Sequence, residues 1–135
     1  MNTLFKIAKS NDIEIVAGNI PHCVSMSMDG YVCLDFSCFS NSASSRVHLG
    51  HEIGHCMTGA FYSRYMPFQV RRKQENTADK WAIRQLIPKS AFFRALGNGY
   101  TEICQLAEYF NVIEEFMRKA YCYYMHGNLA VELYF

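Results

Sequence analysis

The stretch HLGHEIGHCMTG, residues 48–59, places three histidines and a glutamate within an otherwise apolar run. A buried core does not need so many titratable groups, and a solvated face would not surround them with Leu49, Ile53 and Met57. Serines that precede the stretch can cap a helix, and Gly59 is a natural helix stop. We therefore expect a helix over about residues 45–58 that carries a functional site.

The centre of this stretch, His51-Glu52-Ile53-Gly54-His55, is an H-E-x-x-H sequence. Because positions i and i+4 of a helix lie on one face, His51 and His55 can direct their imidazole nitrogens at one metal ion, about 2.0–2.1 Å away for zinc. Glu52 is rotated by one residue step, so it can reach a water molecule at the ion without binding the ion itself. This arrangement is typical of metal-assisted peptide hydrolysis, in which the glutamate is the general base.

Two histidines leave a catalytic zinc site incomplete, because such a site usually has three protein ligands and one open position. The next acidic residues are in QENTADKWA, where Glu75 and Asp79 are four positions apart and share one face of a second predicted helix, over about residues 71–86. We assign Glu75 to the metal and Asp79 to a hydrogen bond with the far ring nitrogen of a ligating histidine. The reverse assignment, with Asp79 as the ligand, stays open.

Three further side chains are candidates for contacts with a substrate or an oxyanion, namely His48, Tyr62 and Tyr65. His48 could instead cap the helix, and the two tyrosines could pack as part of an aromatic loop. Gly50 and Gly54 are each unfavourable in a helix interior by about 1 kcal/mol relative to alanine. We therefore expect these glycines to let another backbone, or the substrate, come close to the helix.

The N-terminal pattern predicts a small sheet beside a helix. Residues 3–10 have helical spacing, and residues 13–17 have the pattern of a strand that ends at a glycine. The stretch VSMSMDGYVCLDFS, residues 24–37, predicts a hairpin with Asp-Gly at its turn. Met26 and Met28 alternate with serines in its first strand. These features predict an antiparallel sheet with one buried apolar face, and hence a mainly helical α+β fold.

The C-terminal part of the chain predicts helices only. Pro88 ends the second long helix, a short helix follows over residues 89–96, and two helices broken near Asn111 form a C-terminal helical hairpin. The spacing of LAEYFNVIEEFMRKA, residues 106–120, also suits a helix-turn-helix that binds DNA. However, Glu114 and Glu115 would meet the phosphates at the start of the second helix. We therefore expect this segment to pack against the metal-binding helices.

The bulk numbers limit the class of protein. A chain of 135 residues fits one domain, and such a domain buries roughly two-thirds of its unfolded surface. We expect a single domain over 1–135, composed of an N-terminal helix and sheet (1–43), metal-binding helices (44–88) and C-terminal helices (89–135). The net charge of +1 provides no field that would attract nucleic acid or an anionic membrane.

The same bulk features indicate the compartment. Lys6 and Lys9 interrupt the apolar residues of the N-terminus, so we expect no signal peptide, and no run approaches the roughly 18 apolar residues of a membrane span. We expect a cytoplasmic location without a membrane partner. The six cysteines contain no C-x-x-C pair. In a reducing compartment we expect most of them to be small buried thiols.

Three stretches together, HEIGHCMTGAFY, KQENTADKWAIRQLIP and LAEYFNVIEEFMRKA, resemble the ImmA/IrrE family of metallo-endopeptidases. The similarity covers nearly the whole chain from about Asp29 onward. It implies a compact α+β domain with one Zn²⁺ ion, related to the gluzincins. Carried over, His51 and His55 match the histidine ligands, Glu52 the general base, and Glu75 the glutamate of an E-x-x-A element. Many relatives have asparagine after that alanine, where this chain has Asp79.

The resemblance also implies a function and a partner. Members of the family are commonly encoded by phages and mobile elements beside a helix-turn-helix repressor, and some cleave such a repressor. We therefore expect a zinc-dependent endopeptidase whose substrate is a cognate transcriptional repressor. One alternative is a metal-binding regulator that controls a repressor by contact without proteolysis. Another is a purely structural zinc site, which would have four protein ligands.

Overall fold

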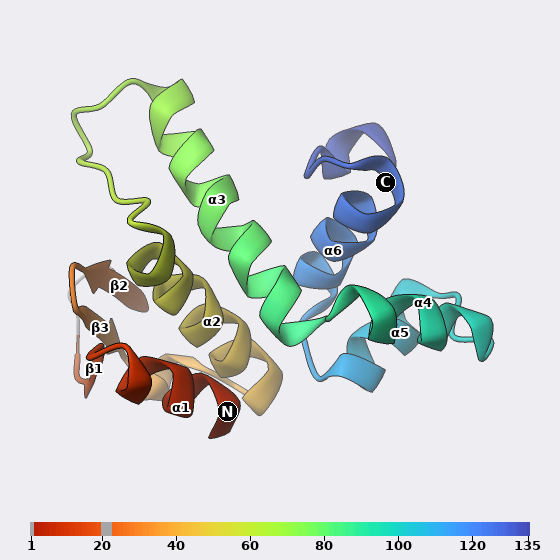
Figure 1. Cartoon of the computed structure of the whole chain (residues 1–135), viewed down its shortest axis with the longest axis horizontal. Helices are drawn as coiled ribbons and strands as arrows, with labels where there is room; N and C mark the ends of the chain where they lie inside the picture. Colours follow the sequence, from red (N-terminus) through yellow and green to blue (C-terminus); the bar gives the residue numbers. More distant parts are fainter. Residues whose placement is uncertain (1, 20–22) are drawn as a thin grey trace.

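The computed structural model describes residues 2–19 and 23–135, and its elements confirm the predicted α+β class (Figure 1). Two short 3₁₀ helices accompany the main elements, at Phe36–Cys38 and Val131–Leu133. The main elements are α1 (Asn2–Ser10), β1 (Glu14–Ala17), β2 (Ser25–Met28), β3 (Tyr31–Leu34), α2 (Ser42–Thr58), α3 (Phe68–Leu86), α4 (Lys89–Gly97), α5 (Ile103–Phe110) and α6 (Glu114–His126).

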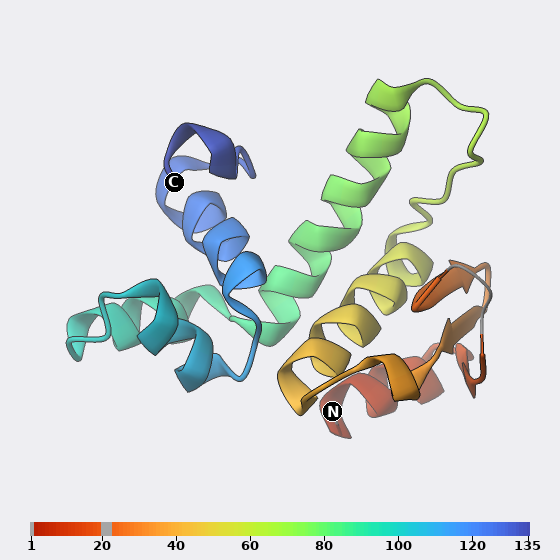
Figure 2. The same ribbon diagram turned by 180° about the vertical axis from the view of Figure 1, so that it is seen from behind.

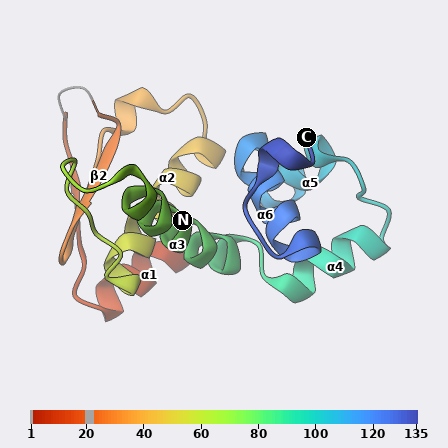
Figure 3. The same cartoon turned by 90° about the horizontal axis from the view of Figure 1, so that it is seen from above.

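Helices α2 and α3 form the centre of the molecule and lie side by side (Figure 1). Helix α1 and the sheet lie against α2, on the side away from α3 (Figure 2). Helices α4, α5 and α6 form a separate group beyond the C-terminal end of α3, which is clear in the view from above (Figure 3). The two central helices therefore lie between the sheet and the C-terminal helices.

Local signals explain the bounds of the two central helices. The side chain of Asn41 accepts a hydrogen bond from the backbone of Ser44 at 2.8 Å, so α2 begins at Ser42 rather than at Ser45 as predicted. Gly59 ends α2 in the left-handed conformation, with φ of 68°. Helix α3 begins at Phe68 rather than near residue 71, because Pro67 precedes it with a φ angle already suited to a helix start.

The predicted antiparallel sheet is wrong for one strand. The strand order is β1-β3-β2, in which β2 and β3 form the predicted antiparallel hairpin and β1 pairs with β3 in parallel. Gly30 forms the hairpin turn with φ of 82°. The chain passes from one edge of the sheet to the other between β1 and β2, so the hairpin brings β3 back beside β1 in the same direction.

The expectation that the methionines of β2 lie on the buried face is also wrong. Met26 is 42% exposed and Met28 is 61% exposed. Instead Ser27 pairs with Val32 of β3, and this valine is fully buried, so the serines of β2 share the inner face with the apolar residues of β3. The alternation predicts the strand correctly but not its inner face, which the pairing of β2 with β3 at the edge of the sheet determines.

The C-terminal helices pack as predicted. Asn111 separates α5 from α6 with φ of 53°, and both helices contribute to the same apolar core as α3. The hydroxyl of Tyr124 on α6 donates to the carbonyl of Ile87 at 2.6 Å. Glu114 and Glu115 are exposed at the start of α6. The residues that α5 and α6 contribute to this core are Leu106, Ala107, Phe110, Phe116, Met117 and Ala120.

Two further expectations have mixed outcomes. Within residues 2–19 and 23–135, no helix is both long and apolar enough to cross a membrane. All six cysteines are free thiols, but the expectation that most are buried is wrong. Cys122 is buried, whereas Cys23, Cys38 and Cys104 are exposed.

Candidate metal centre

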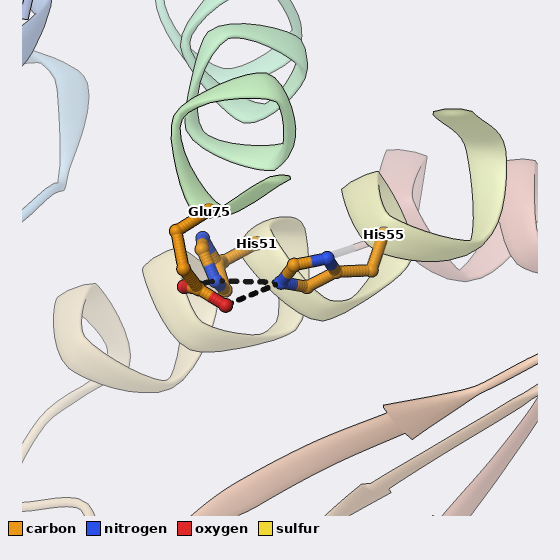
Figure 4. A group of neighbouring side chains, drawn as sticks. All are labelled: His51, His55 and Glu75. Carbon is orange, nitrogen blue, oxygen red and sulfur yellow. Dashed lines mark hydrogen bonds and ion pairs between the residues drawn. The ribbon is translucent and has the colours of Figure 1, made fainter. Parts of the chain in front are cut away.

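Three side chains from two helices converge on one point (Figure 4). His51 and His55 project from α2 and Glu75 projects from α3, and one ligand atom of each lies within 4.8 Å of the others. The Nε2 atoms of the two histidines are 3.1 Å apart. The carboxylate oxygens of Glu75 lie 2.8 Å from Nε2 of His51 and 3.1 Å from Nε2 of His55. These three residues could hold a metal ion.

Hydrogen bonds at the Nδ1 atoms fix the ring orientation and the tautomer of both histidines. Nδ1 of His55 lies 2.5 Å from the carbonyl oxygen of Ala60, and Nδ1 of His51 lies 2.7 Å from Oδ1 of Asp79. A carbonyl and an ionised carboxylate can only accept, so both Nδ1 atoms carry the proton and donate. In the neutral rings, both Nε2 atoms are therefore left as lone-pair donors that face the carboxylate of Glu75.

The Nε2 lone pairs of His51 and His55 and the carboxylate of Glu75 face one another, and such groups repel unless a positive charge lies between them. Burial lowers the pKa of His51, but hydrogen bonds with Asp79 and Glu75 outweigh burial and raise this pKa to about 10. A proton on Nε2 or a metal ion can supply that charge. A tetrahedral zinc site has ligand atoms about 3.3 Å apart, given bonds of about 2.0–2.1 Å. The observed separations are close to that value, so the donor set fits a metal ion.

Glu75 is the acidic member of the cluster. Burial raises the pKa of its carboxyl group, but the contacts with His51 and His55 and a hydrogen bond from Tyr62 lower this pKa by more, to well below its usual range. The carboxylate therefore stays ionised. Its bond with the Tyr62 hydroxyl also acts on the tyrosine, since burial and Glu75 together raise the pKa of Tyr62 to about 12.

Glu52 lies beside the cluster but outside it. Its Oε1 atom is 4.0 Å from Nε2 of His51, and the residue is only 7% exposed. Burial raises the pKa of its carboxyl group, while the charges of His51 and His55 and a hydrogen bond from Ser27 act in the opposite direction. A raised pKa makes this carboxylate a better proton acceptor at neutral pH than an exposed glutamate is.

Two cavities flank the cluster, and Glu75 borders both of them. The first has a volume of about 240 Å³ and lies between the inner side of β2 and the segment after α2. The second has a volume of about 300 Å³ and lies between α2, α3 and α6. The first is lined by Ser25, Met26, Ser27, Glu52, His55, Phe61, Tyr62 and Glu75.

Asp79 does not belong to the cluster of possible ligands. The residue is 6% exposed, and its two oxygens have different partners. Oδ1 accepts from Nδ1 of His51 at 2.7 Å, and Oδ2 accepts from the ammonium group of Lys119 at 3.0 Å. Hydrogen bonds and charges from these two partners lower the pKa of Asp79 against the opposing effect of burial. Glu75, and not Asp79, is therefore the carboxylate that belongs to the cluster with His51 and His55.

The other candidate side chains lie at different distances from the cluster. His48 borders the second cavity, and its ring packs on Phe39 with the centroids 5.0 Å apart. Tyr62 borders the first cavity. Tyr65 is 82% exposed, and its hydroxyl accepts a hydrogen bond from Arg64, so it faces solvent rather than either cavity beside the cluster.

Sequence reasoning did not identify three groups that contact the site. The carbonyl of Ala60 contacts His55 just after the Gly59 stop, a position that no side-chain pattern marks. Ser27 contacts Glu52 because β2 turns its serines inward. Lys119 contacts Asp79 from a helix that is 40 positions further along the chain. The alternating serines of β2 could have indicated a polar inner face, whereas nothing in the sequence marks Lys119 as a partner of Asp79.

Comparisons with known proteins complete this description. No curated protein and no solved structure matches the chain. A family model described as the IrrE N-terminal-like domain, a metallopeptidase family, matches residues 40–121. The matched region contains all of α2 and α3, and with them the three residues of the cluster and Glu52. The chain therefore belongs to the family of IrrE N-terminal-like peptidase domains.

Proposed function

We propose that this chain is a zinc-dependent endopeptidase with one Zn²⁺ ion held by His51, His55 and Glu75. The observation that carries this proposal is the convergence of one ligand atom from each of these three residues. The Nδ1 atoms of both histidines already have hydrogen-bond partners, so the Nε2 atoms are the ones available to a metal ion. Three protein ligands leave a fourth position for substrate or water, which is the composition of catalytic rather than structural zinc sites. When bound, the ion supplies a Lewis acid that polarises a peptide carbonyl and increases the acidity of water.

Glu52 is the general base in this proposal. Its carboxylate lies 4.0 Å from His51 Nε2 and borders the first cavity, so a water molecule can reach both Glu52 and the metal position. Glu52 accepts a proton from the attacking water at a carboxylate oxygen. It then delivers this proton to the nitrogen of the departing amine, which completes cleavage of the peptide bond.

Tyr62 is the donor that we propose for the developing oxyanion. Its hydroxyl group bonds to Glu75 and borders the same cavity as Glu52. Because its pKa is raised to about 12 by burial and by Glu75, this hydroxyl keeps its proton at neutral pH and can donate. His48 borders the second cavity, where it can contact a substrate segment on the other side of the metal position.

The substrate that we propose is a helix-turn-helix transcriptional repressor of a phage or mobile element, and the site of action is the cytoplasm. The resemblance to ImmA/IrrE proteins supports this choice of substrate. The two cavities that share Glu75 in their lining also suit an extended polypeptide that crosses the metal position. Neither the net charge of +1 nor the two exposed glutamates at the start of α6 favours direct binding to DNA.

The decisive experiment tests whether the wild type and Glu52→Gln cleave a purified helix-turn-helix repressor. We expect the variant to bind Zn²⁺ with unchanged affinity and to lose cleavage, because the amide cannot accept a proton. Glu108→Gln, at an exposed position on α5, is the matched control and should cleave normally. Cleavage by Glu52→Gln at the wild-type rate would refute the assignment. An intact repressor that nevertheless leaves its DNA would favour regulation by contact.

A further inference from the structure

A chain of three side chains links the C-terminal helices to the metal centre. Lys119 of α6 donates to Oδ2 of Asp79 at 3.0 Å, and Oδ1 of Asp79 accepts from Nδ1 of His51 at 2.7 Å. The far nitrogen of the same imidazole, Nε2, faces Glu75. Each oxygen of the buried carboxylate therefore has one partner, and these partners come from two different helices.

The position of the ammonium group is fixed by the helix that carries it. On α6 the neighbours Phe116, Met117 and Ala120 are all buried, so the backbone next to Lys119 is anchored in the core. The Lys119 side chain is 34% exposed, and its ammonium group reaches the buried carboxylate of Asp79 at 3.0 Å.

The carboxylate of Asp79 needs this cation. A buried carboxylate is unstable unless charge and hydrogen bonds compensate it. When His51 binds a metal through Nε2, its imidazole is neutral and offers Asp79 a hydrogen bond but no ionic proton. Among the side chains that the structure describes, Lys119 then remains the one formal cation in direct contact with Asp79. Without Lys119, the Asp79 carboxylate would be free to rotate toward solvent and away from His51.

We propose that Lys119 is a positioning residue that acts through Asp79 to hold the His51 ring in its metal-binding orientation. The inference rests on the proposed function only in that His51 is a metal ligand. This inference gives α6 a role in the metal centre beyond packing, because α6 carries the lysine that holds Asp79 in place. Since partners of this kind commonly change metal affinity by about 10–100-fold, we expect an effect near the lower value for a residue one contact further out.

The test measures metal binding on the full chain, without any peptide substrate. We expect Lys119→Met to weaken Zn²⁺ binding about tenfold, measured by competition with a chromophoric chelator. The visible absorption bands of the Co²⁺-loaded protein should also shift, because the angle of one ligand changes. Lys119→Arg, which keeps the cation, should restore both readouts. Arg118→Met removes the adjacent cation, which pairs with Glu114 at the surface, and should change neither.

The sign of the effect separates positioning from simple repulsion. A cation that merely repelled the metal ion would give tighter Zn²⁺ binding once it was removed, so tighter or unchanged binding in Lys119→Met overturns the proposal. A double-mutant cycle tests the route of the effect. Within the Asp79→Asn background, Lys119→Met should cause no further loss of affinity. A full tenfold loss in that background would show that Lys119 does not act through Asp79.

Two measurements keep these outcomes interpretable. Thermal unfolding followed by circular dichroism shows whether each variant is folded before metal is added, and Lys119→Gln replaces Lys119→Met if the latter does not fold. Metal affinity and Co²⁺ spectra do not depend on peptide cleavage. If the wild type binds metal but cleaves no repressor, the proposed function fails while the role of Lys119 can still hold. If Lys119→Met cleaves the repressor normally and binds Zn²⁺ with unaltered affinity, the role of Lys119 fails while the proposed function holds.

Discussion

A β-carbon on Gly54 would lie only 2.7 Å from the carbonyl oxygen of Ala78, so the backbones of α2 and α3 touch at this pair. The pair lies within the segment that carries the cluster, since Gly54 precedes His55 and Ala78 follows Glu75 by three positions. The expectation that this glycine admits another backbone is therefore confirmed. The close approach of the two helices determines the distance between the histidines of α2 and the glutamate of α3.

Gly54→Ala tests this close approach. The added methyl group has no room, so we expect the helices to separate and the free energy of unfolding to fall by about 1–3 kcal/mol, despite the higher helix propensity of alanine. Zn²⁺ binding should weaken as well, because Glu75 moves away from the histidines. Chemical denaturation and chelator competition measure the two effects.

The matched control for Gly54→Ala is Gly97→Ala on α4. A β-carbon at Gly97 would meet no atom within 4 Å. Helix propensity alone then acts, so we expect this variant to be as stable as the wild type or more stable, by up to about 1 kcal/mol. Equal stability of the two alanine variants would mean that the contact between Gly54 and Ala78 does not limit the approach of α2 and α3.

Metal binding should depend on pH because a proton competes for His51. Its pKa of about 10, raised by Asp79 and Glu75 against the effect of burial, means that Nε2 is protonated at neutral pH until a metal displaces the proton. Affinity for Zn²⁺ should therefore rise with pH, by about tenfold per unit below that pKa. Isothermal titration calorimetry in two buffers of different ionisation enthalpy should detect about one proton released per ion. An affinity that is constant between pH 6 and pH 8 would contradict this coupling.

Tyr62→Phe separates metal binding from catalysis. The hydroxyl that we propose as oxyanion donor is lost, and one such donor typically contributes about 10²–10³ in kcat. We expect kcat, measured with Zn²⁺ in saturating excess, to fall by that order, with a much smaller change in KM. Zn²⁺ affinity should weaken as well, by about tenfold, because the hydroxyl no longer donates to the ligand Glu75. Tyr65→Phe is the control, since Tyr65 is exposed and points away from the two cavities. An equal fall in kcat in both variants would show that Tyr62 is not the oxyanion donor.

The sequence predicted those parts of the site that depend on spacing within one helix. His51 with His55, and Glu75 with Asp79, are each four positions apart, so the geometry of a helix turn fixes which of them share a face. The order of the helices, the hairpin turn at Gly30 and the break at Asn111 followed from equally local signals. Such features need no knowledge of tertiary structure.

The remaining parts depend on how distant elements pack. The hydrophobic alternation in β2 predicted a strand correctly, but the face that Met26 takes depends on the pairing of β2 with β3 and on its position at an edge. The parallel pairing of β1 depends on a crossing between the two edges of the sheet. The contact from Lys119 to Asp79 joins two helices, and a surface lysine with one buried partner has no distinguishing pattern in a sequence.

A final prediction concerns the bond that joins α6 to the end of α3. The hydroxyl of Tyr124 donates to the carbonyl of Ile87, and its burial, with a smaller effect of Tyr123, raises the pKa of Tyr124 to about 12. Tyr124→Phe removes this hydrogen bond and leaves the carbonyl without its partner. We expect the free energy of unfolding to fall by about 1–2 kcal/mol at pH 7. Tyr109→Phe, at an exposed position, should leave the stability unchanged.

The burial of the Tyr124 hydroxyl predicts how stability changes in alkali. Because the pKa of Tyr124 is higher in the folded chain than its ordinary value of 10.0, the folded state holds the phenolic proton more tightly than the unfolded state. This contribution is complete below pH 10 and is lost as the pH rises toward 12. The difference in stability between the wild type and Tyr124→Phe should therefore shrink above pH 10 in denaturation curves. A difference that stays constant across this range would mean that burial does not raise the pKa of Tyr124 in the folded chain.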